Sequence, residues 1–164
     1  MISQPTPEDY FRGSLEILET AVNQYRSGRR TFYRVAALQL RLLLCDSTRR
    51  HNTTVDISLA PQIVPRLRLP ALDSAGQPKK PDTDLPLPDW LGQTLPLTGS
   101  EGEHLSIRTL IRRVCDQDGG AHVDPKPNAG LYADSSPAGL SPAEWIVRLS
   151  EIVLAATKPF DYSP

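Results

Sequence analysis

The distribution of proline limits what this chain can fold into. Half of the sixteen prolines of the 164-residue chain lie between residues 51 and 100. Proline lacks a backbone N–H and blocks helix continuation, so long helices are excluded from this stretch. Residues 7–46, 105–115 and 141–157, outside it, carry apolar residues at helical spacing. The sequence therefore predicts helices that flank a partly extended, proline-rich middle.

The first two predicted helices form a hairpin. Thr6-Pro7 supplies a capping hydroxyl and a proline at the first helical position, so the first helix begins there, and Gly28 ends it. The second helix covers residues 30–46 and is apolar on more than half of its circumference. Because the connection is short, the two helices are expected to be antiparallel neighbours.

The third predicted helix lies before a polar segment. Its start is either Ser100 or Ser106, and it ends before Asp116. Its inward stripe consists of five aliphatic residues, Leu105, Ile107, Leu110, Ile111 and Val114.

The fourth predicted helix begins at a capping box. Ser141-Pro142-Ala143-Glu144 combines a capping serine, a first-turn proline and a reciprocal glutamate, and the helix ends before Pro159. Four amphipathic helices must pack on one another to bury their apolar stripes. We therefore predict a mainly α fold, a bundle of about four helices with a small two-stranded β element and a long proline-rich loop, as one domain over residues 1–164.

The middle of the chain contains two stretches with strand-like alternation. Apolar and polar residues alternate at 55–59 and at 67–69, and these stretches are expected to pair as a small hairpin. Residues 73–89 have turn and polyproline composition and are expected to form an exposed loop. Trp90 then follows in a short turn that should dock on the helices.

Charge and hydropathy favour neither a membrane nor nucleic acid as a general partner. The net charge is −1, and the longest apolar run, residues 35–45, is interrupted by Gln39 and Arg41 and is too short to cross a bilayer. Residues 1–10 have neither the basic nor the apolar region of a secretory signal. We therefore expect no membrane partner and a cytoplasmic location.

The most unusual polar segment follows the third helix. Asp116, Asp118, His122 and Asp124 lie within nine residues around Gly119-Gly120. The glycines allow a tight turn, so the four side chains could converge. Carboxylates with a histidine suit Mg, Mn or Zn, and a histidine beside acids can act as a general base. The four residues are therefore candidate ligands of a divalent metal, and His122 with Asp118 are candidate catalytic residues.

The same segment also has a purely structural interpretation, which the sequence favours. Asp116 and Asp118 would be solvated at a helix end, the glycines would terminate the helix, and His122 would fix the loop by a hydrogen bond. The pattern does not match a calcium-binding EF-hand loop. The separation of Arg113 from His122 does not match the motif of HEPN ribonucleases, so no residue role is transferred from that class.

Five arginines are candidate phosphate- or partner-binding residues. Arg108, Arg112 and Arg113 lie outside the apolar stripe of the third helix, and Arg29 and Arg30 lie between the first and second helices. Guanidinium groups bind carboxylate or phosphate through paired donors. The alternative is that these arginines pair on the surface with acids, because residues 1–70 carry a net charge of +4 and residues 71–164 carry −5.

Two functions are compatible with these features. The preferred one is an interaction module for a protein or, alternatively, a nucleic acid, which requires no cofactor. The other is a ribonuclease-like phosphodiester hydrolase, in which His122 and its neighbouring acids hold a divalent metal or act as base and the helical arginines bind phosphate. An uncovered apolar helix face would also allow a homodimer.

Overall fold

The described part of the chain is mainly helical, as predicted. The computed structural model describes residues 3–45, 47–50, 53–56, 58–73, 76–79, 83–96, 104–115 and 140–157. Its helices are α1 (Pro7–Arg26), α2 (Tyr33–Leu40), α3 (Leu59–Ile63), α4 (Leu87–Leu91), α5 (Ile107–Val114) and α7 (Pro142–Thr157). Three antiparallel pairs of short strands accompany them, where one pair was predicted: β1 (Ser47–Arg50) with β2 (Thr53–Asp56), β3 (Arg68–Pro70) with β4 (Asp84–Pro86), and β5 (Thr94–Pro96) with β6 (His104–Ser106).

The start of α1 has the capping geometry that its sequence predicts. The backbone N–H of Asp9 donates to the Thr6 hydroxyl at 3.2 Å, and the backbone N–H of Thr6 donates to the Asp9 carboxylate at 2.8 Å. Pro7 occupies the first helical position. The helix ends at Arg26, and Gly28 follows with a φ of +109°. Both predicted ends are confirmed to within two residues.

The second predicted helix is a composite of three helical forms. A 3₁₀ turn (Arg30–Phe32) precedes α2, and a π-helical turn (Arg41–Cys45) follows it, so the segment is helical from residue 30 to residue 45. Along this segment, the side chains of Ala36, Leu40 and Leu43 are completely buried.

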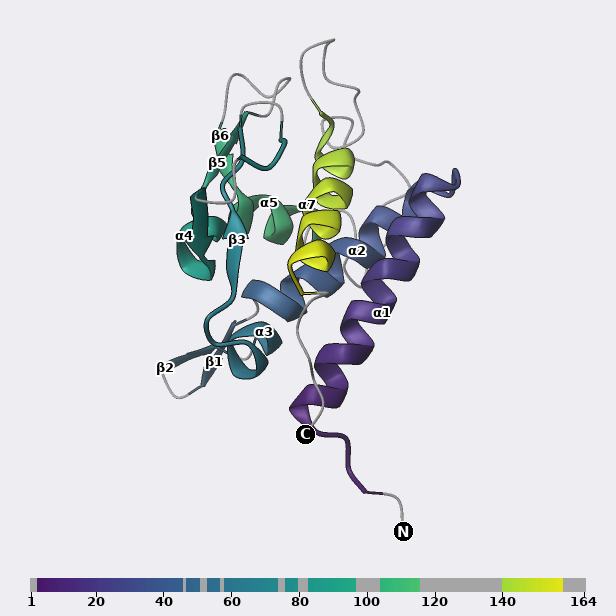
Figure 1. The fold of residues 1–164 in the computed structure, drawn as a ribbon. Helices are drawn as coiled ribbons and strands as arrows, with labels where there is room; N and C mark the ends of the chain where they lie inside the picture. Colours follow the sequence, from purple (N-terminus) through teal and green to yellow (C-terminus); the bar gives the residue numbers. More distant parts are fainter. Residues whose placement is uncertain are drawn as a thin grey trace.

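Serine caps fix the starts of α5 and α7. Ser106 accepts from the backbone N–H of Thr109 at 3.1 Å, which decides between the two predicted starts. Ser141 accepts from the backbone N–H of Glu144 at 3.2 Å, which is the serine half of the predicted capping box. In Figure 1, α7 lies between α1 on one side and α5 with β3 on the other, and its fully buried Ile146 and Val147 help to close the core.

The predicted pairing of strands in the middle of the chain is wrong. Val55 belongs to β2, which pairs with β1, whereas Leu69 belongs to β3, which pairs with β4. Between them Leu59 and Ala60 are buried in the short helix α3. Alternation identifies a strand but does not identify its partner, because pairing depends on distant parts of the chain.

The predicted exposed loop over residues 73–89 is also partly ordered into elements. Residues 77–79 are exposed as expected, but β4 and the start of α4 lie in the same segment. Pro70 and Pro86 stand at the ends of their strands, where a missing backbone N–H is tolerated. Leu69 pairs with Leu85, so apolar contact between two short strands organises a segment that composition alone assigns to a loop.

Trp90 docks on the helices as predicted. Its side chain is completely buried, and its indole N–H donates to the Pro70 carbonyl at 3.0 Å, which joins α4 to β3. The same core contains Trp145, Tyr33 and Phe11, all at most 1% exposed. Among the described helices, none is both long enough and apolar enough to cross a membrane.

Candidate binding cleft

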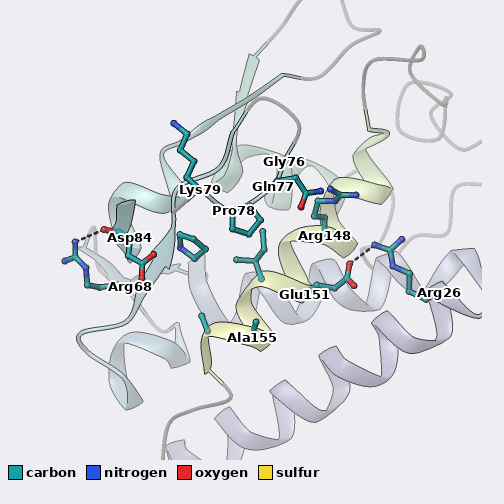
Figure 2. A pocket seen from close by; sticks show the side chains of 13 residues that line it. Arg26, Arg68, Gly76, Gln77, Pro78, Lys79, Asp84, Arg148, Glu151 and Ala155 are labelled. Carbon is teal, nitrogen blue, oxygen red and sulfur yellow. Dashed lines mark hydrogen bonds and ion pairs between the residues drawn. The ribbon is translucent and has the colours of Figure 1, made fainter. Parts of the chain in front are cut away.

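An open cleft lies between α7 and the segment that connects β3 to β4. Its volume is about 750 Å³, within the range of roughly 300–1,000 Å³ that is usual for ligand sites. Figure 2 shows the cleft with side chains of α1, α7, the β3–β4 sheet and the turn 76–79 around it. We call it the α7 cleft; it is lined by Arg26, Arg68, Pro70, Gly76, Gln77, Pro78, Lys79, Asp84, Arg148, Glu151, Ile152, Ala155 and Ala156.

The floor of the α7 cleft is apolar. Ile152, Ala155 and Ala156 come from successive turns of α7, and Pro70 and Pro78 face them from the other side. Alanine side chains on this face of the helix leave space that larger residues would fill. The floor can therefore take up apolar side chains of a ligand and remove them from water.

The turn over the cleft requires glycine at position 76. Gly76 has a φ of +79°, and a Cβ atom there would lie 2.5 Å from two ring carbons of Trp145. The turn is held by Asp73, which accepts at its carbonyl from the Gly76 N–H at 3.1 Å and at its carboxylate from the Gln77 N–H at 2.9 Å. The wall of the cleft thus rests directly on a buried ring of α7.

Charged side chains surround the apolar floor. Arg68, Lys79 and Arg148 are basic, whereas Asp84 and Glu151 are acidic. Figure 2 shows Arg148 beside Gln77 above the floor and Lys79 extending outward from the turn. A fourth basic residue, Arg26, also lines the cleft, so the rim has more basic than acidic groups.

Arg26 belongs to an ion-pair network that joins α1 to α7. Its guanidinium donates to Glu144 and to Glu151, the latter at 2.6 Å. Burial alone would raise the pKa of Glu144, but hydrogen bonds from Arg26 and Tyr25 and the charges of Arg26 and Arg148 hold it below its usual value of 4.5. Burial, reinforced by the hydrogen bond to Glu144, raises the pKa of Tyr25. Arg26 therefore fixes the helices, and the basic groups left for a ligand are the other three.

Arg68 also borders a second cavity. Its guanidinium donates to the backbone carbonyl of Asp84, on the paired strand β4, at 2.7 Å (Figure 2). The second cavity has a volume of about 430 Å³. We call it the proline-rimmed pocket; it is lined by Leu44, Pro61, Val64, Pro65, Arg66, Leu67, Arg68, Pro86, Leu87, Pro88, Leu91 and Arg108.

The five predicted arginines lie in different places. Arg108 is exposed and lines the proline-rimmed pocket. Arg112 is half-buried and donates to the Cys45 carbonyl at 3.3 Å, a contact that joins α5 to the end of the second helical segment. Arg113 is half-buried on the same helix, and neither it nor Arg112 lines the cleft or the pocket.

Arg29 and Arg30 lie outside both cavities. Both are exposed at the turn after α1, and the Arg30 guanidinium lies over the Tyr25 ring, 5.5 Å from its centre. A cation at this distance from a ring face is attracted by the ring quadrupole. The structure therefore separates the predicted arginine candidates, of which Arg108 lines one of the two cavities described above.

The predicted metal and catalytic residues, Asp116, Asp118, His122 and Asp124, lie outside the described residues. Within the ranges that are described, no three His, Cys, Asp or Glu side chains come together in a way that could hold a metal ion. The possible divalent metal and the catalytic roles of His122 and Asp118 stay predictions.

Sequence reasoning did not identify most of the residues at the two cavities. Arg148 is outside the apolar stripe by which the fourth helix was predicted, so it was not singled out. Lys79 lies in the segment that was predicted to be a loop. The available signal was the alternation of Arg68 with Leu67 and Leu69, because it indicates that this arginine lies on the opposite side of an extended segment from the two leucines.

No protein-family model matches the chain, and no curated protein or solved structure is significantly similar to it.

Proposed function

We propose that this protein is a binding module that holds an acidic segment of a partner protein in the α7 cleft. The observation that carries the proposal is the combination, in one cleft of about 750 Å³, of an apolar floor with a rim in which basic groups are in excess. Such a surface provides both hydrophobic burial and charge complementarity. The proposal requires no cofactor.

The composition of the rim favours a peptide over a nucleic acid. Arg148 and Lys79 would face carboxylates of the bound segment, whereas Asp84 and Glu151 would repel a continuous polyanion. None of the thirteen described residues that line the cleft is aromatic, so these residues offer no ring on which a base could stack. A nucleic-acid partner is therefore the less supported alternative.

The walls of the cleft support binding because they are already held in place. Gly76 rests on Trp145, and Arg26 fixes α7 against α1 through Glu151. Pro70 and Pro78 have restricted backbones on the opposite wall. A preformed cleft loses little conformational entropy when it binds a ligand, which leaves more of the contact energy for affinity.

Selection from a displayed library of random peptides would test this proposal. We expect the wild-type protein to enrich sequences in which Asp or Glu alternates with aliphatic residues. The Lys79→Gln/Arg148→Gln variant removes two basic groups of the rim and is expected to bind the selected peptides about tenfold more weakly or worse. The matched control is Arg29→Gln/Arg30→Gln, which removes the same charge away from the cleft and should bind normally.

Two results would contradict the proposal. One is a selection without acidic enrichment, and the other is equal binding of selected peptides by the Lys79→Gln/Arg148→Gln variant and the wild type. Tight binding of labelled single-stranded RNA or DNA that is lost in this variant would instead favour the nucleic-acid alternative.

The phosphodiester hydrolase is the second candidate function. It is favoured by the position of Arg112 and Arg113 in the last turn of α5, directly before residues 116–124. These arginines could bind phosphate if His122 and the three aspartates act on it. A cytoplasmic location also stays a prediction.

Homodimerisation stays a prediction as well. The large apolar side chains that are most exposed in the described part of the chain belong to the first two helical segments: Tyr10, Ile17, Leu38 and Leu42.

A further inference from the structure

The proline-rimmed pocket has a different chemical character from the α7 cleft. It lies where the connection from α3 to β3 meets α4 and the start of α5. Its volume of about 430 Å³ is sufficient for a small molecule of moderate size.

The interior of the pocket is aliphatic and its rim is stiff. The aliphatic side chains that line it are between 1% and 7% exposed: Leu44, Val64, Leu67, Leu87 and Leu91. Four prolines surround them: Pro61, Pro65, Pro86 and Pro88. Proline fixes its own backbone φ, so the opening is held without a ligand. The pocket is thus a preformed hydrophobic site.

Among the described residues that line the pocket, the charged side chains are all arginines. Arg66, Arg68 and Arg108 are exposed, so their charged groups are at its mouth rather than in its interior. None of the described residues that line the pocket is acidic. Over the described ranges, neither Arg66 nor Arg108 takes part in an ion pair. The positive charge at the mouth is therefore not neutralised by the described residues that line the pocket.

The position of Arg108 is unfavourable for the helix that carries it. It lies in the first turn of α5, which begins at Ile107 after the Ser106 cap. The N-terminal end of a helix carries partial positive charge, so an arginine there is repelled, whereas an anion is attracted. A negatively charged group between Arg108 and Arg66 would relieve this repulsion. The arginines of the rim and the N-terminal end of α5 thus both favour a negatively charged ligand.

We propose that the proline-rimmed pocket binds a small amphiphilic anion, an aliphatic chain that ends in a carboxylate. The chain would lie among Leu67, Leu87 and Leu91, and the carboxylate would accept hydrogen bonds from Arg66 and Arg108. The planar guanidinium groups match the two oxygens of a carboxylate. This site is separate from the peptide-binding function of the α7 cleft and does not depend on it.

Isothermal titration calorimetry of the full chain with octanoate tests the proposal. Octan-1-ol has the chain without the charge, and acetate has the charge without the chain. We expect octanoate to bind at one site, and both analogues to bind about tenfold more weakly or worse. On addition of octanoate, the methyl NMR signals of Leu67, Leu87 and Leu91 should shift.

Variants assign the binding to the arginines. Arg66→Gln/Arg108→Gln is expected to weaken octanoate binding by about tenfold or more, and thermal melting would check that it is folded. Arg29→Gln/Arg30→Gln carries the same charge change away from the pocket and should bind like the wild type. Lys79→Gln/Arg148→Gln should also bind octanoate normally, so failure of the peptide proposal and failure of this one can be told apart.

Three outcomes would overturn the proposal. They are absence of octanoate binding to the wild type, equal affinity for octanoate and octan-1-ol, and unchanged affinity in a folded Arg66→Gln/Arg108→Gln variant. Octyl phosphate binding more tightly than octanoate would overturn the assignment of a carboxylate head group.

Discussion

At the scale of single residues, two glycines with positive φ have different surroundings. Gly28 has a φ of +109°, and a Cβ added there would have no other atom within 4 Å, whereas a Cβ at Gly76 would lie 2.5 Å from the Trp145 ring. At both positions the positive φ disfavours any residue with a side chain. At position 76 a side chain would in addition overlap the Trp145 ring. Comparison of the two sites therefore separates backbone strain from steric overlap.

We expect Gly28→Ala to lower the free energy of unfolding by about 1 kcal/mol and Gly76→Ala to lower it by about 2–4 kcal/mol. The larger loss reflects displacement of the turn from Trp145. Gly13→Ala, in the middle of α1 with open space around it, is expected to stabilise the protein by up to about 1 kcal/mol. Urea unfolding measures all three, and equal losses at positions 28 and 76 would contradict the contact argument.

Glu144 links stability to pH. Its pKa is held below 4.5 in the folded protein, so its contribution to stability is complete above the pKa of the unfolded chain and is lost as pH falls through the lower, folded value. Glu144→Gln is expected to cost about 1 kcal/mol at neutral pH, because the bonds to Arg26 and Tyr25 are weakened. Thermal melting from pH 7 to pH 3 should show the difference between variant and wild type shrinking below about pH 4.5. A difference that is constant with pH would disprove this role.

At the scale of elements, the four predicted helical segments were found in the structure, whereas the short helix α3 and the partners of the strands were not predicted from sequence. The starts of α1, α5 and α7 depend on caps within three residues, such as Ser141 with Glu144, and these signals are visible locally. The partner of β3 is β4, whose central residues pair as Leu69 with Leu85 after a long intervening segment. Nothing in either short strand specifies the other, because the pairing also depends on how α4 docks.

Trp90 is the residue through which α4 docks on β3. Trp90→Phe keeps a buried ring but removes the hydrogen bond to the Pro70 carbonyl. We expect a loss of about 1–3 kcal/mol in the free energy of unfolding, from the unsatisfied carbonyl and the reduced volume. Because Pro70 lines the α7 cleft and Leu91 lines the proline-rimmed pocket, binding at both should also weaken. Unchanged stability in urea unfolding would show that α4 is held by other contacts.

At the scale of the whole molecule, the two cavities could not be predicted from local patterns. The α7 cleft combines Arg26 of α1, the turn at Lys79 and Arg148 of α7, which are far apart in the sequence. Of the five candidate arginines chosen from sequence, Arg108 lines the proline-rimmed pocket and the other four line neither of the two cavities. It was chosen for its position outside an apolar stripe, a local criterion that also selected Arg112, which has a structural contact. The face of a helix on which a residue lies predicts whether its side chain is exposed. Which side chains come together at a cavity depends on how the helices and strands pack.

The metal hypothesis for residues 116–124 can be tested on the whole protein. If the protein is a binding module, Mg²⁺, Mn²⁺ and Zn²⁺ should change the melting temperature of the wild type and of His122→Ala equally. Elemental analysis of the purified protein should then find no stoichiometric metal. A stabilisation by metal that is lost in His122→Ala would show that this segment is a site and would favour the hydrolase.

The position of Arg68 on both cavities has a thermodynamic consequence. One guanidinium, already donating to the Asp84 carbonyl, borders the α7 cleft and the proline-rimmed pocket. An acidic segment in the cleft and a carboxylate in the pocket are both anionic and would lie on either side of this residue, so they would repel each other and each ligand would lower the affinity for the other. Because such coupling between binding equilibria is reciprocal, the factor must be the same in both directions. A protein with these two sites would release its partner segment as the small anion accumulates.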